Sequence, residues 1–258
     1  MDLIKSRDSK YGEYEELLLE RDQLEKEAGQ IRTAYLKLFG RLITENYEEK
    51  LECIKCKKTI AYYQSALNRG GKVDASEMQK WLDGEMADYY RNLKAMLREN
   101  DEAAKAKTST PYEVQRAKTL YRRLAKLIHP DMNPETAGSD ILLDLWQRIL
   151  TAYHHNDVKD LSELEVLVRK ALKDLGAGES RVEIPDIEDR IDEIKEEIEN
   201  IRTTEPYTLR SLVEDEDAIA KKREELQEEL ESYQKYHKEL STVILQMLQG
   251  GGLAINVG

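Results

Sequence analysis

Cysteine and phenylalanine are scarce in this chain of 258 residues, which contains two cysteines and one phenylalanine. Two cysteines cannot build the disulfide framework on which small secreted domains depend. No apolar run resembles a signal peptide or reaches the roughly 18 residues that a membrane-spanning helix needs. We therefore expect a cytoplasmic protein that contacts no membrane.

The motifs of common catalytic and nucleotide-binding sites are also missing. The chain has no Walker loop, no G-x-G-x-x-G, no G-x-S-x-G and no H-E-x-x-H. No other grouping of side chains forms a catalytic constellation. We therefore expect a protein that is not an enzyme and that binds no cofactor or metal.

Positive charge is in deficit, since 40 lysines and arginines face 52 aspartates and glutamates and the net charge is −12. Residues 179–231 hold 20 acidic and 8 basic side chains, which accounts for the whole excess. A protein that binds nucleic acid needs clustered lysines and arginines to neutralise phosphates. The overall charge therefore argues against a nucleic-acid partner, although a local basic face stays open.

Apolar residues recur at helical spacing along nearly the whole chain, and sustained alternation of the kind typical of strands is absent. This pattern predicts an all-α protein. Capping residues, glycines and prolines place the expected helices at residues 11–67, 74–105, 111–128, 140–154 and 158–175. The first two helices are expected to form a long N-terminal hairpin over residues 1–108.

A strict seam of isoleucines begins the acidic C-terminal part. Its members are spaced by threes and fours, as in a coiled coil: Ile184, Ile187, Ile191, Ile194, Ile198 and Ile201. The pattern breaks at residues 203–212 and resumes in a second, longer arm. We predict an antiparallel coiled-coil hairpin over residues 179–249 and a flexible tail over residues 250–258. The seam can pair within the chain or between chains, so a homo-oligomer through the coiled coil stays open.

A basic helix stands out in the middle of this acidic chain. Residues 111–131 contain five basic and two acidic side chains, and Thr110-Pro111 with Glu113 match the preferred chemistry of a helix start. The helix is amphipathic and ends in the segment LYRRLAKLIHPD, residues 120–131. Pro130 disfavours helical geometry at His129, so we expect a turn at His129-Pro130-Asp131.

This segment resembles helix II and the His-Pro-Asp loop of the J-domain (DnaJ/Hsp40) family. The segment LWQRILTAY, residues 145–153, is similar to the family's helix III. The resemblance covers about residues 110–156 and implies a J-like core, which we place at residues 109–178 with one extra helix. The family's short first helix has no counterpart directly before Thr110, and Asp88-Tyr89-Tyr90 is the nearest similar sequence.

The resemblance implies a co-chaperone that binds a DnaK-type chaperone and stimulates its ATP hydrolysis. In the family, the basic face of helix II docks on the ATPase domain, and the residues that correspond here are Lys118, Arg122, Arg123 and Lys126. The loop aspartate acts where that domain meets its interdomain linker, and Asp131 takes this place. His129 and Pro130 shape the loop and join the contact. The flanking helices would bind or position a client protein, whose identity the sequence does not give.

The remaining polar groups have ordinary structural interpretations. Cys53 and Cys56 form a lone C-x-x-C without the second ligand pair of a zinc site or the preceding strand of a redox pair. The pair His154-His155 reads as a solvated helix end. The acidic run at residues 214–217 suits the N-terminus of the helix that follows it.

Two other functions remain open from the sequence. The J-like core can serve only for packing in a coiled-coil scaffold or adaptor that stimulates no ATPase. The basic helix can alternatively bind nucleic acid, which the surrounding negative charge disfavours.

Overall fold

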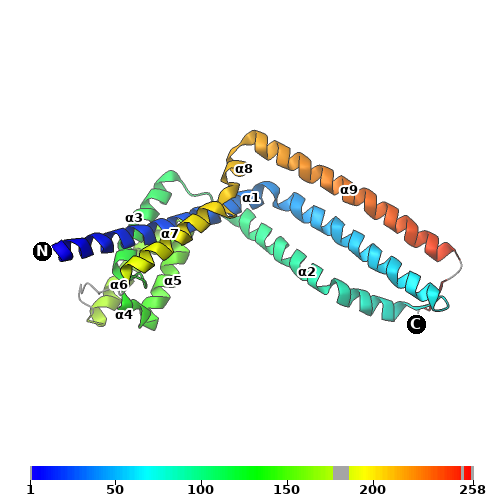
Figure 1. The fold of residues 1–258 in the computed structure, drawn as a ribbon, viewed down its shortest axis with the longest axis horizontal. Coiled ribbons are helices and arrows are strands. Elements are labelled where there is room, and N and C mark those ends of the chain that lie inside the picture. The colour runs from blue at the N-terminus through cyan, green and yellow to red at the C-terminus, as the bar shows by residue number, and fades with distance from the viewer. Residues whose placement is uncertain (1, 177–185, 251–252, 257–258) are drawn as a thin grey trace. The chain divides into compact units, whose positions relative to one another are not determined.

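The computed structural model describes residues 2–176, 186–250 and 253–256 and confirms an all-α fold. The helices and short strands, labelled in Figure 1, are α1 (Asp2–Asn68), β1 (Lys72–Asp74), α2 (Ala75–Lys105), α3 (Pro111–Ile128), α4 (Pro134–Ala137), α5 (Asp140–His154), α6 (Val158–Asp174), α7 (Ile187–Thr203), α8 (Arg210–Glu214), α9 (Glu216–Gln249) and β2 (Ala254–Asn256). A 3-10 turn, Tyr207–Leu209, precedes α8. No helix in the described ranges combines the length and apolarity needed to cross a membrane.

The chain divides into two compact units that differ from the predicted domains. The first unit combines residues 1–32 with 107–208, and the second combines residues 33–106 with 209–258. The single helix α1 contributes to both units. The boundaries predicted at residues 108 and 178 assume that each domain is one continuous segment of the chain. Each unit instead joins two segments that lie far apart in the sequence.

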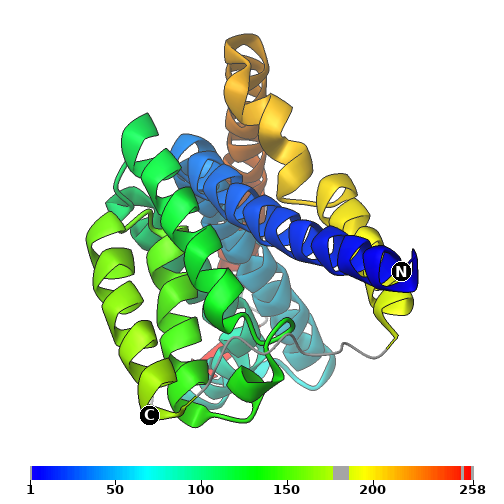
Figure 2. The ribbon, with the colours of Figure 1, turned by 90° about the vertical axis from the view of Figure 1, so that its left-hand side faces the viewer.

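The first unit is built around α3, α5 and α6, which lie side by side in Figure 2. Helices α3 and α5 are antiparallel, because Tyr121 stacks on Tyr153 at 3.9 Å while His129 meets Trp146 at 4.7 Å. Their apolar faces share one core with the first part of α1 and with α7. The helix-III-like face predicted from the sequence is buried as expected: Leu145, Trp146, Ile149, Ala152 and Tyr153.

The predicted C-terminal hairpin is wrong, because the isoleucine seam packs on α1 rather than on the second arm. Lys195 of α7 bonds Glu13 at 2.8 Å, and seven residues later Arg202 bonds Glu20 at 2.5 Å, so the two helices are parallel. The buried members of the seam, Ile191, Ile194 and Ile198, share a core with Tyr14 and Leu18. The seam therefore pairs within the chain. Ile184 lies outside the described residues.

The second unit places α2 and α9 on either side of the later part of α1, as Figure 1 shows. Helix α2 forms the predicted hairpin with α1, and Leu51 packs against Leu82 and Met86. The helices approach closely at Gly40, where the Asn100 side chain leaves no room for a Cβ atom. Asn100 uses this space to donate hydrogen bonds to the Gly40 carbonyl oxygen and to Thr44.

Helix α9 runs parallel to α1 within the second unit. Asn46 donates to the Leu226 carbonyl oxygen at 2.8 Å, and seven residues later the Cys53 thiol lies 3.4 Å from the Tyr233 carbonyl oxygen. The acidic run before α9 supplies its cap, since Asp215 accepts hydrogen bonds from two backbone N–H groups of the first turn. The predicted role of this run at a helix N-terminus is confirmed.

The C-terminal tail predicted over residues 250–258 contains a short strand. Residues 254–256 form β2, which pairs in parallel with β1 over residues 72–74. Val73, the middle residue of β1, is buried in a cluster with Tyr63 and Ala66 of α1. The sequence showed no strand here because three residues are too short for a visible alternation. Residues 251, 252, 257 and 258 of the tail lie outside the described residues.

Candidate functional site

The basic helix α3 begins at the capping box predicted from the sequence. Thr110 accepts a hydrogen bond from the Glu113 N–H at 3.2 Å, and the Glu113 carboxylate accepts one from the Thr110 N–H at 2.7 Å. The backbone N–H groups of both residues thus have hydrogen-bond acceptors. Leu120, Leu124 and Ile128 are buried on the opposite side of the helix. The buried face fixes the rotation of α3 and directs its basic side chains outward.

The four predicted basic residues differ in their surroundings. Arg122, Arg123 and Lys126 are exposed, whereas Lys118 is half-buried. The Arg123 guanidinium bonds Glu165 of α6 at 2.7 Å. The Lys126 ammonium lies 2.6 Å from Glu15 of α1. We define the exposed three, Arg122, Arg123 and Lys126, as the basic face.

His129 ends α3 and points into the core, with 3% of its surface exposed. Its ring meets Trp146 edge-on at 4.7 Å. The Nδ1 atom accepts the Asp131 N–H at 3.1 Å, so a neutral ring carries its proton on Nε2. That atom lies 3.5 Å from the Oδ2 atom of Asp22. His129 therefore holds the loop against α5 and α1 through its buried contacts with Trp146 and Asp22.

The loop after His129 is short and tightly bonded. The His129 carbonyl oxygen accepts the N–H groups of Met132 and Asn133 at 3.0 and 2.8 Å. Pro130 is half-buried, and the Asp131 side chain is 44% exposed. The Asp131 carboxylate lies 3.6 Å from Arg21, which belongs to α1. The backbone thus presents Asp131 at the surface while its neighbour His129 faces inward.

Asp22 of α1 is the centre of a buried polar network beneath this loop, and sequence reasoning missed it. The Tyr121 hydroxyl donates to Asp22 at 2.5 Å, and Arg21 donates to the other carboxylate oxygen at 3.1 Å. Burial tends to raise the pKa of Asp22, but hydrogen bonds from His129 and Tyr121 and the charge of Arg21 outweigh it and lower that pKa. Burial and the nearby charge of Asp22 raise the pKa of Tyr121.

A second buried contact between α1 and the end of α5 involves Lys26. Its ammonium donates to Asn156 at 2.5 Å and lies 3.7 Å above the Tyr153 ring. Asn156 in turn donates to Ser109, and the Tyr153 hydroxyl donates to Gln23 at 2.5 Å. Burial, with a smaller effect from the charge of Lys118, lowers the pKa of Lys26 to about 8. The first part of α1 is therefore joined to α3 and α5 by polar as well as apolar contacts.

The sequence did carry a signal for the missed residues. Asp22 follows Tyr14 and Leu18 at steps of four, which places a carboxylate on an apolar stripe. A charge at such a position needs a buried partner. The segment considered for the missing first helix, at Tyr89 and Tyr90, instead lies in the second unit.

The other polar candidates occupy structural positions. Cys53 and Cys56 are buried between α1 and α9, and burial raises the pKa of both thiols. His154 and His155 are exposed at the end of α5, as the sequence predicted. Within the described part of the chain, no group of three or more His, Cys, Asp or Glu side chains is placed to hold a metal ion.

Comparison with family models, with curated proteins and with solved structures finds no match for this chain. The geometry of residues 110–156 and the contacts made by α1 are therefore the basis for a functional proposal.

Proposed function

We propose that this protein is a J-domain co-chaperone of the cytoplasm that binds a DnaK-type chaperone and stimulates its ATP hydrolysis. The observation that carries the proposal is the opposite placement of the first and last residues of the His129-Pro130-Asp131 turn. His129 is buried against Trp146, while Asp131 is exposed at the end of a basic helix. Asp131 follows the helix that carries Arg122, Arg123 and Lys126, so its carboxylate and these basic side chains are all open to a partner protein.

The basic face is suited to a transient acidic partner. Arg123 and Lys126 are paired with Glu165 and Glu15, but both basic side chains are about half exposed. The carboxylates of Glu165 and Glu15 are only 16% and 19% exposed, so an acidic partner would contact the outward side of Arg123 and Lys126 and leave both pairs in place. Arg122 is exposed on the same side of α3. These charges would steer the partner and increase its association rate.

The mechanism is differential binding rather than acid–base chemistry. The chain accelerates its partner's reaction to the extent that α3 and Asp131 bind the hydrolysis-competent state more tightly than the resting state. A rigid loop makes this discrimination sharper, and the hydrogen bonds to the His129 carbonyl oxygen supply that rigidity. The protein itself would hold no nucleotide and catalyse no step.

Single-turnover ATP hydrolysis by the DnaK-type protein of the same organism tests the proposal. The full-length chain is expected to increase the rate, and Asp131→Asn is expected to abolish the increase while leaving the fold intact. The matched control is Asp144→Asn, which removes an exposed carboxylate from α5 of the same unit. Replacement of Arg122 by alanine should weaken stimulation and reduce its dependence on salt.

The proposal would be overturned if the Asp131→Asn variant increased the rate of ATP hydrolysis as much as the wild type does. The absence of stimulation by a wild-type chain whose circular dichroism shows a folded helical protein would overturn it as well. Recovery of partner proteins by such an inactive chain would favour a coiled-coil scaffold. The remaining function in the proposal is the positioning of a client by the helices outside the J-like core.

A further inference from the structure

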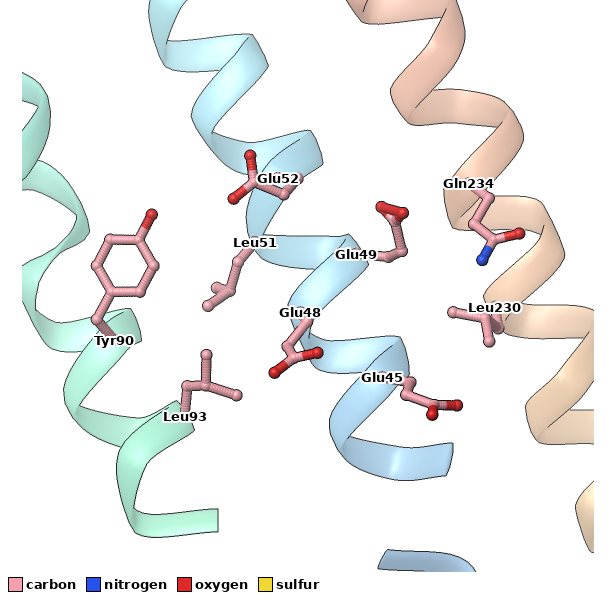
Figure 3. Close-up of a pocket in the computed structure, with 9 residues that line it drawn as sticks. All are labelled: Glu45, Glu48, Glu49, Leu51, Glu52, Tyr90, Leu93, Leu230 and Gln234. Atoms are coloured by element: carbon pink, nitrogen blue, oxygen red, sulfur yellow. The ribbon is translucent and has the colours of Figure 1, made fainter. Parts of the chain in front are cut away.

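The second unit contains a groove that the proposed chaperone contact does not use. It has a volume of about 510 Å³ and lies along α1, where α2 and α9 flank that helix (Figure 3). The lining side chains come from all three helices. A groove bounded by three helices on one side is the surface on which a fourth helix can lie.

The apolar part of the groove is formed by Leu51, Tyr90, Leu93 and Leu230. Leu51 and Leu230 are buried, Leu93 is half-buried, and Tyr90 is 41% exposed. In Figure 3, Tyr90 and Leu93 extend from α2 on one side and Leu230 from α9 on the other. Leu51 is covered by its neighbours, so Tyr90, Leu93 and the small exposed part of Leu230 supply the apolar surface that an anchor can contact.

The charged part of the groove is entirely acidic. All four charged lining residues are glutamates of α1: Glu45, Glu48, Glu49 and Glu52. Their steps of three and four place like charges next to each other on one helix face, which is unfavourable for an isolated helix. Partial compensation comes from Arg41 and Lys55, which lie 3.6 and 3.5 Å from Glu45 and Glu52. The Nδ1 atom of His237 lies 3.0 Å from the Glu49 carboxylate.

We propose that this groove binds a basic amphipathic helix of the client protein. The client's apolar side chains would pack on Tyr90, Leu93 and Leu230, and its lysines or arginines would face the glutamates of α1. The stretch from Glu45 to Glu52 covers about 10 Å of helix, which matches anchors at positions i, i+3 or i+4, and i+7. The identification of the occupant as a client rests on the proposed co-chaperone function.

The chemistry of the groove distinguishes this occupant from others. Four carboxylates repel nucleic acid and acidic proteins. A small cation or polyamine would use the carboxylates but would gain little from Tyr90, Leu93 and Leu230. A basic amphipathic helix uses both parts of the surface.

Fluorescence anisotropy with a designed peptide tests this inference on the full chain. The probe is a labelled helical peptide of about 16 residues, long enough to form a helix, with leucines at i, i+3 and i+7 and lysines beside them. A scrambled peptide of the same composition has the same charge without the apolar face. The groove variant is E45Q/E48Q/E52Q, which leaves Glu49 and its contact with His237 in place.

The matched control variant is E224Q/E228Q/E239Q, which removes three exposed glutamates from α9 without touching the groove lining. The amphipathic peptide should bind the wild-type chain, and the groove variant should bind it about tenfold more weakly. Tyr90→Ala should weaken binding as well, whereas the control variant should bind as the wild type does. Circular dichroism verifies that each variant is folded.

Several outcomes would overturn the inference. One is equal weakening by the groove and control variants, which would indicate bulk charge alone. Others are equal binding of the scrambled peptide, competition by spermidine without any effect of Tyr90→Ala, and the absence of peptide binding. Self-association that the groove variant abolishes would assign the groove to a second copy of the chain and would also overturn it.

The two proposals fail separately. The groove lies in the second unit and the His129-Pro130-Asp131 turn in the first. Asp131→Asn should therefore bind the peptide normally, and E45Q/E48Q/E52Q should stimulate ATP hydrolysis normally in the absence of peptide. Peptide binding without any ATPase stimulation would reject the co-chaperone function and leave a peptide-binding adaptor.

Discussion

Removal of the Asp22 carboxylate should destabilise the first unit and loosen the loop above it. Asp22 is 5% exposed and receives hydrogen bonds from Tyr121 at 2.5 Å and from Arg21 at 3.1 Å. Asp22→Ala leaves the buried Tyr121 hydroxyl without its acceptor, which costs about 1–3 kcal/mol. It also removes the partner of the largely buried Arg21 guanidinium, which keeps contacts with Glu197 and Asp131.

The total loss is expected to be about 3–5 kcal/mol, as for other buried charges deprived of one partner. Tyr121→Phe should cost about 1.5–3 kcal/mol, because it removes one bond to a charged acceptor. The double variant should cost about 2 kcal/mol less than the sum, since the two changes remove the same hydrogen bond. This coupling separates the hydrogen bond from any general disturbance of packing.

Urea unfolding followed by tryptophan fluorescence measures these values. Trp146 lies in the first unit and Trp81 in the second, so a Trp81→Phe background restricts the signal to the unit that contains Asp22. A loss below about 1 kcal/mol for Asp22→Ala, or additivity with Tyr121→Phe, would refute the network as a stabilising element.

The pH dependence gives a second check on the same group. The pKa of Asp22 in the folded protein lies below its ordinary value of 3.8, so the unfolded chain takes up the proton first as the pH falls. The contribution of Asp22 is therefore complete above about pH 4 and declines as the pH falls through the lowered pKa. The difference in unfolding free energy between the wild type and Asp22→Ala should shrink over the same range.

Two further predictions concern buried contacts of α1. The pKa of Lys26 is lowered to about 8 from 10.5, so the folded protein loses this proton first and the wild type should gain about 2–3 kcal/mol over Lys26→Met between pH 8 and 10. Urea unfolding at several pH values measures this change, and a constant difference would contradict the lowered pKa. Ile194→Ala should cost the first unit about 2–5 kcal/mol, whereas the exposed Glu196→Ala should change it by less than about 0.5 kcal/mol. A small loss for Ile194→Ala, with weaker self-association, would show that the seam serves another chain.

Local features of the helices were predictable because their causes lie within a few residues. The capping box at Thr110, the cap at Asp74 and the turn at residues 68–71 all depend on side-chain and backbone groups that are neighbours in sequence. The buried faces of α3 and α5 likewise follow from apolar periodicity. The basic face of α3 could be identified for the same reason.

The partners of the helices could not be predicted in the same way. The isoleucine seam of α7 specifies an apolar face but does not specify which helix covers it. Both α1 and α9 carry apolar residues at helical spacing, and α1 is the helix that packs on the seam. Parallel pairing of α7 with α1 requires contacts between residues about 180 positions apart. Apolar periodicity contains no information about partners so far apart in the sequence. We therefore predicted pairing with the next helix along the chain.

The His129-Pro130-Asp131 turn shows the same division between local and tertiary causes. The sequence by itself determined that a basic amphipathic helix ends at a proline and that a helix with Trp146 and Tyr153 follows. Only the tertiary structure decided that His129 faces inward and Asp131 outward. The buried His129 ring and the Tyr121 hydroxyl both meet the carboxylate of Asp22, which belongs to α1. A buried carboxylate more than 100 residues away can be located only after the chain has folded.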